Sequence, residues 1–396
     1  MFFSCLDAQK PDPLLSLIEA FASDQRPGKL DLSVGVYRDD HGRTPVMRAV
    51  KLAEERLVRD QPSKSYLGPD GDRRFAECLG ELVLGRGLSG QARGIQTVGG
   101  TGALSIAAGL LGAGGVSRKI WLGTPTWSNH LPLFAAAGLP VRTYSHVDEQ
   151  GGGFALDAFL AAVQQASPGD AFLLQGCGHN PTGIDPDIAT WTKIGRALAD
   201  RGLIPLIDLA YQGFGAGVEE DARGMRDLLG VVPEAVIAVS CNKTFGLYRD
   251  RVGALLCYGN DAAGLDLAMA NARGIARCSY SMPPDHGAAV VRTILDDAGL
   301  AAIWREELDA MRNRLRATRR ALAASPGADA LGLGGVAGQG GMFCLLPLDG
   351  AQVERLRSRF AIFVAPDGRV NLAALPLERV GAFTEALADV ALRVAS

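Results

Sequence analysis

The chain has 396 residues, of which 47% are hydrophobic and 21% charged, and its formal net charge is −3. This length predicts two or three structural units rather than one compact core. Nucleic acids and anionic membranes attract proteins with a basic excess, so the slightly acidic balance excludes both as main partners. Small molecules are the expected targets.

The seven cysteines are odd in number and scattered, with no C-x-x-C pair. This pattern predicts neither a disulfide framework nor a metal site, and it fits a reducing compartment. The N-terminal apolar run is too short for a signal peptide, and no later run reaches the roughly 18 residues that a membrane helix needs. We therefore expect a cytoplasmic protein.

The N-terminal region predicts one helix and one short strand. Apolar residues from Leu14 to Phe21 recur at helical spacing, Pro27 and Gly28 end the helix, and the strand-like sequence LDLSVGVY follows. Between residues 97 and 258, short apolar runs alternate with helical stretches. Uninterrupted apolar strands of this kind predict a mostly parallel sheet with helices on both faces; the runs are KIWLG, AFLLQG, LIPLIDLA, AVIAVS and VGALLCYG.

The last third of the chain predicts long helices around a glycine-rich loop. One helix is expected from Ile303 to Leu322, the loop covers residues 332–341, and a final amphipathic helix runs from Val380 to Val394. We expect a smaller domain assembled from both termini. The predicted division is an N-terminal arm with part of the small domain (1–45), a large domain (46–305) and a small C-terminal domain (306–396).

Polar residues follow several of the apolar runs, where open α/β sheets bind ligands. Asp208 lies inside one run, where a carboxylate loses much of its hydration and needs a cation or donors to compensate. The alternative is an exposed strand-end Asp that caps the next helix. Asn180 and Ser240 follow two other runs.

Lys243 also follows a buried run, and Arg251 comes eight residues later. Desolvation and a cationic neighbour both lower the pKa of a lysine, which Schiff-base chemistry with a carbonyl requires. The alternative is an ordinary solvated surface lysine.

The turn GGTGA at residues 99–103 opens an apolar helix, so its backbone N–H groups and the helix N-terminus together suit a phosphate. A dinucleotide fingerprint is not present, because Ser105 stands at the third glycine position and residues 119–126 contain no acid. An ordinary tight turn is the alternative.

Ten short motifs together resemble fold-type-I enzymes that use pyridoxal 5'-phosphate (PLP), and within them the class I aspartate and aromatic aminotransferases. The resemblance covers essentially the whole chain. It implies an α/β fold with a mostly parallel seven-stranded sheet in the large domain and a small α/β domain. The motifs are VGVY (34–37), SKSYLGPDG (63–71), GGTGAL (99–104), PTWSNH (125–130), GHNPTGID (178–185), DLAYQGF (208–214), SCNKTFGLYRDRVG (240–253), ARCSYSMPPDHGA (276–288), GMF (341–343) and GRVNLAAL (368–375).

The resemblance implies how the cofactor ring is held. Lys243 would form the Schiff base with PLP and also move the proton between substrate and cofactor. Asp208 would pair with the pyridine nitrogen, while Asn180 and Tyr211 would bind the phenolic oxygen. Trp127 would stack on the ring and border the substrate, although core packing is an alternative for this residue.

The cofactor phosphate would be held by the backbone at Gly100 and Thr101, by Ser240 and by the planar fork of Arg251. In the family, a tyrosine matching Tyr66 reaches the phosphate of the neighbouring subunit. The resemblance therefore implies a homodimer with shared active sites.

The resemblance also implies two arginines that bind substrate. Arg369, beside Asn180 and the backbone of Gly35, would clamp the α-carboxylate and orient the Cα–H bond over the ring; a surface arginine is the alternative. Arg277 would come from the other subunit and bind the side-chain carboxylate of a dicarboxylic substrate. An aromatic side chain is still admitted where such an arginine swings away.

Two residues depart from the family pattern. Met282 replaces a usual Asn and makes that wall more apolar, which favours aromatic or aliphatic substrates. Gln175 replaces a His that is expected behind Asp208, so the surroundings of that carboxylate are expected to differ. In contrast, Thr44, Thr101 and Arg38 are closer to the aspartate pattern.

We therefore predict an aminotransferase that moves an amino group between an aromatic (Phe, Tyr, Trp) or dicarboxylic (Asp, Glu) amino acid and 2-oxoglutarate or another 2-oxo acid. The alternatives are a strict aspartate aminotransferase, another PLP reaction such as elimination or decarboxylation, and a non-enzymatic PLP-sensing regulator.

Overall fold

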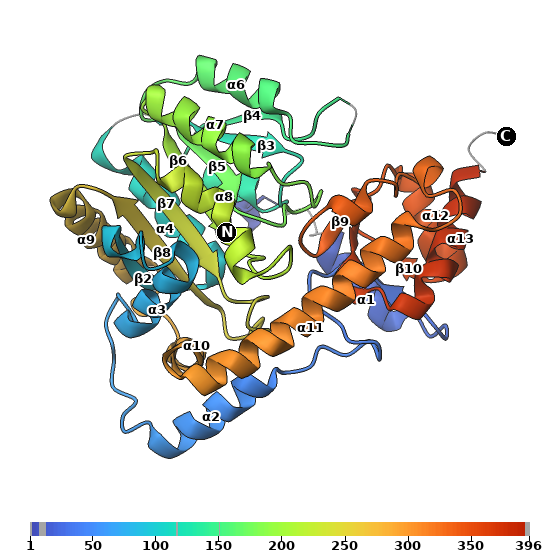
Figure 1. Ribbon diagram of the computed structural model, residues 1–396, viewed down its shortest axis with the longest axis horizontal. Coiled ribbons are helices and arrows are strands. Elements are labelled where there is room, and N and C mark those ends of the chain that lie inside the picture. The colour runs from blue at the N-terminus through green and yellow to red at the C-terminus, as the bar shows by residue number, and fades with distance from the viewer. Residues whose placement is uncertain (1, 8–12, 116–117, 150, 393–396) are drawn as a thin grey trace.

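The computed structural model describes residues 2–7, 13–115, 118–149 and 151–392 (Figure 1). A larger unit surrounds a central sheet, and a smaller unit contains both the first long helix and the last (Figure 1). The α-helices are α1 (Pro13–Ser23), α2 (Arg48–Asp60), α3 (Arg73–Leu84), α4 (Gly99–Gly112), α5 (His130–Ala136), α6 (Leu156–Gln165), α7 (Ile188–Asp200), α8 (Val218–Leu229), α9 (Ala262–Ser279), α10 (Asp285–Asp296), α11 (Ala298–Ala323), α12 (Gly350–Phe360) and α13 (Val380–Leu392).

The central sheet has seven strands in the order β2-β8-β7-β6-β5-β3-β4. Strands β3 to β7 run parallel, whereas β8 is antiparallel to both β7 and β2. Because β8 is reversed, it begins at the edge where β2, β5, β6 and β7 end. The predicted mostly parallel sheet is confirmed; its strands are β2 (Ala92–Val98), β3 (Ile120–Thr124), β4 (Val141–Ser145), β5 (Ala171–Gln175), β6 (Ile204–Leu209), β7 (Glu234–Ser240) and β8 (Val252–Gly259).

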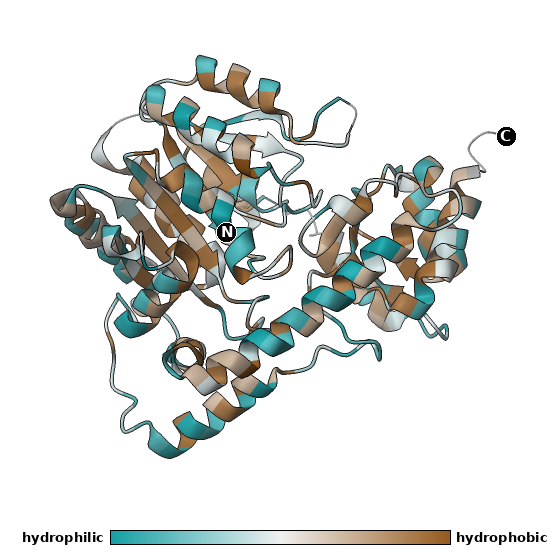
Figure 2. Cartoon of the chain, in the orientation of Figure 1, coloured by the Kyte–Doolittle hydropathy of each residue, from teal (hydrophilic) through white to brown (hydrophobic). Residues whose placement is uncertain are grey.

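Helices cover both faces of this sheet, and the apolar residues of the strands divide between them (Figure 2). In β5, Phe172 and Leu174 pack into one hydrophobic cluster and Leu173 into the other, because successive strand residues point to opposite faces. The first cluster includes residues of α6, α7 and α8, and the second includes residues of α4 and α9. Two-sided burial explains the uninterrupted apolar runs.

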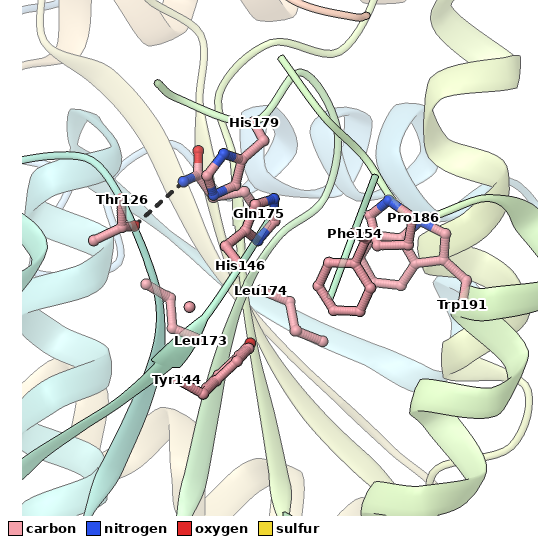
Figure 3. Close-up of a pocket in the computed structure, with 11 residues that line it drawn as sticks. Thr126, Tyr144, His146, Phe154, Leu173, Leu174, Gln175, His179, Pro186 and Trp191 are labelled. Atoms are coloured by element: carbon pink, nitrogen blue, oxygen red, sulfur yellow. Dashed lines mark hydrogen bonds between the residues drawn. The ribbon is translucent and has the colours of Figure 1, made fainter. Parts of the chain in front are cut away.

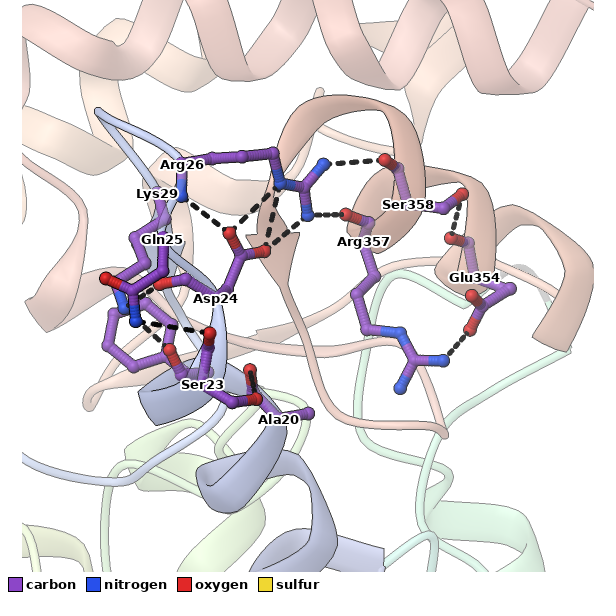
Figure 4. A network of polar contacts seen from close by, with 10 residues as sticks. Ala20, Ser23, Asp24, Gln25, Arg26, Lys29, Glu354, Arg357 and Ser358 are labelled. Carbon is purple, nitrogen blue, oxygen red and sulfur yellow. Dashed lines mark hydrogen bonds and ion pairs between the residues drawn. The ribbon is translucent and has the colours of Figure 1, made fainter.

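The smaller unit brings together segments from both ends of the chain. Its strands are β1 (Leu30–Asp31), β9 (Phe343–Leu345), β10 (Ile362–Phe363) and β11 (Arg369–Asn371). Strand β1 pairs in parallel with β10, and β11 pairs antiparallel with β9. The loop after α1 adds polar contacts: Arg26 donates to the carbonyl oxygens of Arg357 and Ser358 at 2.7 and 2.6 Å, while Asp24 holds its guanidinium (Figure 4).

Helix α11 joins the two units (Figure 1). Near its start, the Trp304 ring stacks on Phe245 with centroids 4.7 Å apart, and its Nε1 donates to the carbonyl of Thr244 at 2.9 Å. Near its end, the buried Arg319 donates to the carbonyl oxygens of Gly340 and Phe343. Burial lowers the pKa of Arg319 to about 10. Both ends of α11 are thus fixed to segments next to candidate site residues.

The predicted elements outside the sheet have mixed outcomes. The helix near the N-terminus is confirmed as α1, and α11 and α13 confirm the two later helices, although Val394 lies outside the described residues. Of LDLSVGVY only Leu30–Asp31 forms a strand, because residues that follow bond instead to scattered groups: the Ser33 N–H donates to the Asp31 carboxylate and the Tyr37 N–H to the Tyr248 hydroxyl. The predicted domain boundaries stay a prediction, and the one after residue 305 falls inside α11.

No helix in the described ranges is long and apolar enough to cross a membrane. Cys78, Cys177, Cys241, Cys257, Cys278 and Cys344 form no disulfide, and the part of the chain that the structure describes contains no cluster of side chains suited to a metal ion. A cytoplasmic location stays a prediction from the sequence.

Candidate active site

A cavity of about 260 Å³ lies at the edge of the sheet where β5, β6 and β7 end and β8 begins. Most of the predicted site residues line it, although they come from distant parts of the sequence. The predicted residues at the cavity are Gly35, Gly100, Thr101, Trp127, Asn180, Asp208, Tyr211, Ser240, Lys243 and Arg251; Leu104, Gln175, Ala210, Asn242 and Tyr248 complete the lining.

One end of the cavity is built from the start of α4 and the start of β8. Gly99 has a positive φ of 66°, and a Cβ placed on it would lie 2.9 Å from Nη2 of Arg251. Arg251 itself has a φ of 56°, a left-handed conformation that is uncommon outside glycine and is found at functional sites. The glycine is therefore needed to bring the helix N-terminus and the guanidinium together.

This end has unused hydrogen-bonding capacity. Ser240 Oγ accepts from the Asn242 backbone N–H at 3.3 Å, so its own hydrogen remains available. Oδ1 of the Asn242 side chain is buried without a partner among the described residues. No described carboxylate forms an ion pair with Arg251, whose Nη1 donates to the Tyr248 carbonyl at 3.1 Å. A helix N-terminus, a hydroxyl and a free guanidinium edge suit a phosphate.

Lys243 stands in the turn after β7 and lines the cavity. Its Nζ lies 5.2 Å from the centroid of the Tyr211 ring. Burial lowers the lysine pKa to about 8; the charge of Asp208 opposes this shift, and the charges of Arg251 and Arg369 add to it. A neutral amine is therefore available near neutral pH, as attack on a carbonyl requires.

Asp208 is 8% exposed and lies within β6, so an exposed helix cap is not its role. Its Oδ2 lies 3.1 Å from Nε2 of His130, which is fully buried at the start of α5. The other ring nitrogen of His130 lies 2.8 Å from the Thr126 hydroxyl. Trp127 packs edge-on against the His130 ring at 5.2 Å while also lining the cavity.

The opposite end of the cavity is built around Asn180 and Arg369. Asn180 Nδ2 donates to the Tyr211 hydroxyl at 3.3 Å, and its Oδ1 accepts from Nη1 of Arg369 at 3.4 Å. Arg369 is 9% exposed and lies over the Phe343 ring, so it is not a surface arginine. A Cβ on Gly35 would meet the same ring at 2.9 Å. This arrangement leaves a buried cation without a described carboxylate partner.

Of the predicted site residues absent from the cavity lining, Arg369 borders it through Asn180, and the other two, Tyr66 and Arg277, lie outside it. Tyr66 is 93% exposed, and Arg277 is exposed and bonds to Ser281. Their segments meet, because the Leu67 backbone N–H lies 3.1 Å from the sulfur of Met282. Two residues of the aspartate pattern also lie elsewhere: Arg38 pairs with Asp31 at 2.6 Å, and Thr44 is exposed.

The prediction about Gln175 is wrong in one respect. A histidine does lie behind Asp208, but it is His130, which comes from a different strand end. Gln175 is the β-sheet neighbour of Asp208, yet its side chain turns to Asn180 and Thr126. His130 was within the motif PTWSNH, three residues after Trp127, and this spacing of one helical turn was the available signal.

Comparisons with known proteins agree with this site. A family model described as aminotransferase class I and II matches residues 27–387. The chain belongs to this family. It is 52% identical to a tyrosine aminotransferase of Rhizobium meliloti over 94% of this chain and 96% of that protein. An aspartate aminotransferase of Escherichia coli is 40% identical over 98% of this chain and 100% of its own length.

A solved aromatic-amino-acid aminotransferase from Burkholderia pseudomallei, covalently bound to pyridoxal phosphate, has a TM-score of 0.93 to this chain. It is 35% identical and covers 98% of this chain and 99% of its own. The fold-type-I architecture is thereby confirmed. The protein is an aminotransferase that acts on amino acids and 2-oxo acids with PLP as cofactor. Arg251, which has no described carboxylate partner, the available hydroxyl hydrogen of Ser240 and the buried Lys243 fit that cofactor.

The low pKa of Lys243 predicts its reactivity in the cofactor-free protein. Reaction with a small neutral aldehyde is expected to increase as the pH rises through about 8, because only the neutral amine attacks and burial favours that form. Borohydride trapping and mass spectrometry of the Lys243 peptide measure the rate. Lys51 is the comparison in the same digest, since its bond to Glu54 raises its pKa. Coinciding profiles for the two lysines would contradict the prediction.

Proposed function

We propose that this enzyme transfers the amino group of an aromatic or dicarboxylic amino acid to 2-oxoglutarate or another 2-oxo acid, in two successive half-reactions. The observation that carries the proposal is the set of groups gathered at one cavity: Arg251 and the α4 N-terminus, Lys243 with Asp208, and Asn180, whose Oδ1 accepts from Arg369 at the border. This set supplies two cationic groups for anions and a nucleophilic amine. Both substrate classes occur among the names of similar proteins.

The cofactor, when bound, supplies an electron sink for the electrons released as the substrate Cα–H bond breaks. Lys243 would hold it covalently and, once freed, would accept the Cα proton at Nζ and return it to the cofactor carbon. Asp208 would keep its negative charge toward the pyridine nitrogen. Asn180 and Tyr211 would bind the phenolic oxygen, Trp127 would cover the ring, and Gly100, Thr101, Ser240 and Arg251 would bind the phosphate.

At the other end, Arg369 would bind the substrate α-carboxylate through its planar fork, with Asn180 and the backbone of Gly35 beside it. Fixing the carboxylate fixes the direction of the Cα–H bond relative to Lys243. Elimination and decarboxylation stay weaker alternatives, because retention of both Arg369 and Arg277 favours transfer between two carboxylate substrates.

The proposal predicts a spectral change that depends on Lys243. Purified protein with added PLP is expected to show visible absorbance that shifts when an amino acid is added. Lys243→Ala is expected to lose this shift and to lower the transamination rate by at least about 1,000-fold, because it removes both the covalent anchor and the proton carrier. Stopped-flow spectroscopy measures the shift. Wild-type protein whose spectrum does not respond to any amino acid would overturn the proposed function.

Substrate choice is proposed to depend on Met282. Its sulfur is polarizable and contacts the backbone of the segment that carries Tyr66. Arg277 lies five residues before Met282 in the sequence. Met282→Asn is expected to lower kcat/KM for phenylalanine relative to aspartate by about tenfold, which corresponds to ~1.4 kcal/mol. Single-turnover rates with both substrates measure the ratio, and Met282→Leu is the matched apolar control. An unchanged ratio in Met282→Asn would contradict this role, and failure of all aromatic substrates in the wild type would favour a strict aspartate aminotransferase.

We also propose a homodimer in which Tyr66 reaches the partner's phosphate site and Arg277 reaches the partner's substrate. Two observations support this. Tyr66 is 93% exposed, and its segment contacts Met282, which follows Arg277 closely in the sequence. None of these three residues lines the chain's own cavity. A closed C2 dimer would place these three residues of each chain at the cavity of the other chain.

Shared sites predict complementation between two defective variants. After subunit exchange between Lys243→Ala and Arg277→Ala proteins, each mixed dimer would contain one doubly defective site and one intact site. Aspartate transamination is expected to recover to about a quarter of the wild-type rate, because half of the dimers are mixed. Lys243→Ala mixed with Asp208→Ala is the control, since both residues line the same cavity and no intact site forms. Equal rates in the two mixtures would contradict shared sites.

A further inference from the structure

Gln175 ends β5 beside Asp208, and its side chain is 9% exposed. The amide points toward Thr126, with the stacked rings of His146 and His179 behind it (Figure 3). Every polar atom of this amide has a partner, so its orientation can be deduced from what each partner is able to do.

The backbone of Asn180 fixes which amide atom lies where. The Asn180 N–H can only donate, so the atom 2.8 Å away must be Oε1 of Gln175. The Asn180 carbonyl can only accept, so the atom 2.9 Å from it must be Nε2. The two contacts agree, and a flipped amide would violate both.

This orientation determines the protons of the next two residues. The second N–H of Gln175 faces the Thr126 hydroxyl oxygen at 3.4 Å, a long contact in which Thr126 accepts. The single hydroxyl hydrogen of Thr126 is then available for Nδ1 of His130 at 2.8 Å. His130 therefore carries its proton on Nε2 and donates it to Oδ2 of Asp208 at 3.1 Å.

The same amide also acts on the substrate end of the cavity. By holding both backbone groups of Asn180, Gln175 fixes the residue whose side chain contacts Tyr211 and Arg369. The two bonds between Gln175 and Asn180 join an amide side chain to backbone groups, all of them uncharged. His146 is neutral, since burial lowers its pKa to about 4, and its Nε2 bonds to the Ile184 carbonyl.

We propose that Gln175 is a positioning residue that keeps Nδ1 of His130 unprotonated, so that the ring meets Asp208 as a neutral N–H donor, and that holds Asn180 at the substrate end. The inference rests on the proposed role of Asp208 as the partner of the pyridine nitrogen. A neutral donor leaves the full negative charge of Asp208 for that partner. A protonated His130 would share this charge and weaken the pairing.

Gln175→Glu reverses the direction of the hydrogen bond to Thr126 with little change in side-chain shape. A carboxylate cannot donate to Thr126, so the Thr126 hydroxyl would donate to Glu and accept from Nδ1 of His130. His130 is then expected to be protonated on both nitrogens at pH 7, and the dissociation constant of PLP is expected to rise about tenfold. Adding Thr126→Val to Gln175→Glu removes the hydroxyl that transmits the change and is expected to return His130 to one proton.

Ring ¹⁵N NMR of the full-length protein with labelled histidine measures these states, with His130 assigned through His130→Gln. Gln212→Glu is the matched control: Gln212 is also buried, and it donates to the carbonyls of Leu82 and Val218 rather than to Thr126. If the buried carboxylate prevents folding, Gln175→Met serves instead, because it also removes the N–H that Thr126 accepts, and the His130 signals are again expected to change.

Identical His130 signals in the wild type and the Gln175 variants between pH 6 and 8 would overturn the inference. The NMR signals do not require bound cofactor, so this result is separate from a failure of the proposed function, which the PLP spectrum reports.

Discussion

The cavity contains more positive than negative charge, and this imbalance organises the site. Lys243, Arg251 and Arg369 face or border it, whereas Asp208 is the carboxylate among its lining residues. Buried charges without partners cost several kcal/mol each, so such a site is stable only if neighbours compensate or a charge is given up. Burial lowers the pKa of Lys243 to about 8, so a fraction of this lysine is neutral near neutral pH. The guanidinium groups of the two arginines have no described carboxylate partner and are available to bind anions. In the proposed function, a cofactor phosphate beside Arg251 and a substrate carboxylate beside Arg369 would complete the balance.

The topology of the sheet explains why these residues meet. Parallel strands present their carboxyl ends at one edge, which places Asp208 and Ser240 together. The reversed strand β8 begins at that edge, so Arg251, which precedes it, arrives beside the residues that end its neighbours. The reversed direction of β8 thus places the cation of Arg251 at this edge. If β8 ran parallel to its neighbours, its carboxyl end would lie here and Arg251 would lie at the opposite edge.

Much of this was predictable from the sequence, and the reason is physical. Strands buried on both faces produce apolar runs, and the polar residues directly after such runs become candidates for one cavity; Asp208, Lys243 and Asn180 were found in this way. The prediction about the residue behind Asp208 failed because it depends on the direction of side chains. Gln175 ends a strand and His130 follows another, and only the hydrogen bonds show that the histidine, not the glutamine, contacts Asp208. The spacing from Trp127 could single out His130 as a candidate, but it does not show which of the two side chains turns toward Asp208.

Helix α11 behaves as a spacer of fixed length between two anchors. Trp304 holds it to Thr244 and Phe245, the residues directly after Lys243, and Arg319 holds it to the loop that leads into Phe343, below Gly35 and Arg369. Fifteen residues of continuous helix separate these anchors by about 23 Å at 1.5 Å per residue. A continuous helix changes length little, so α11 sets the spacing between the segment after Lys243 and the segment that leads into Phe343. The separation of the Lys243 amine from Arg369, the first residue of β11, therefore depends on the length of this helix.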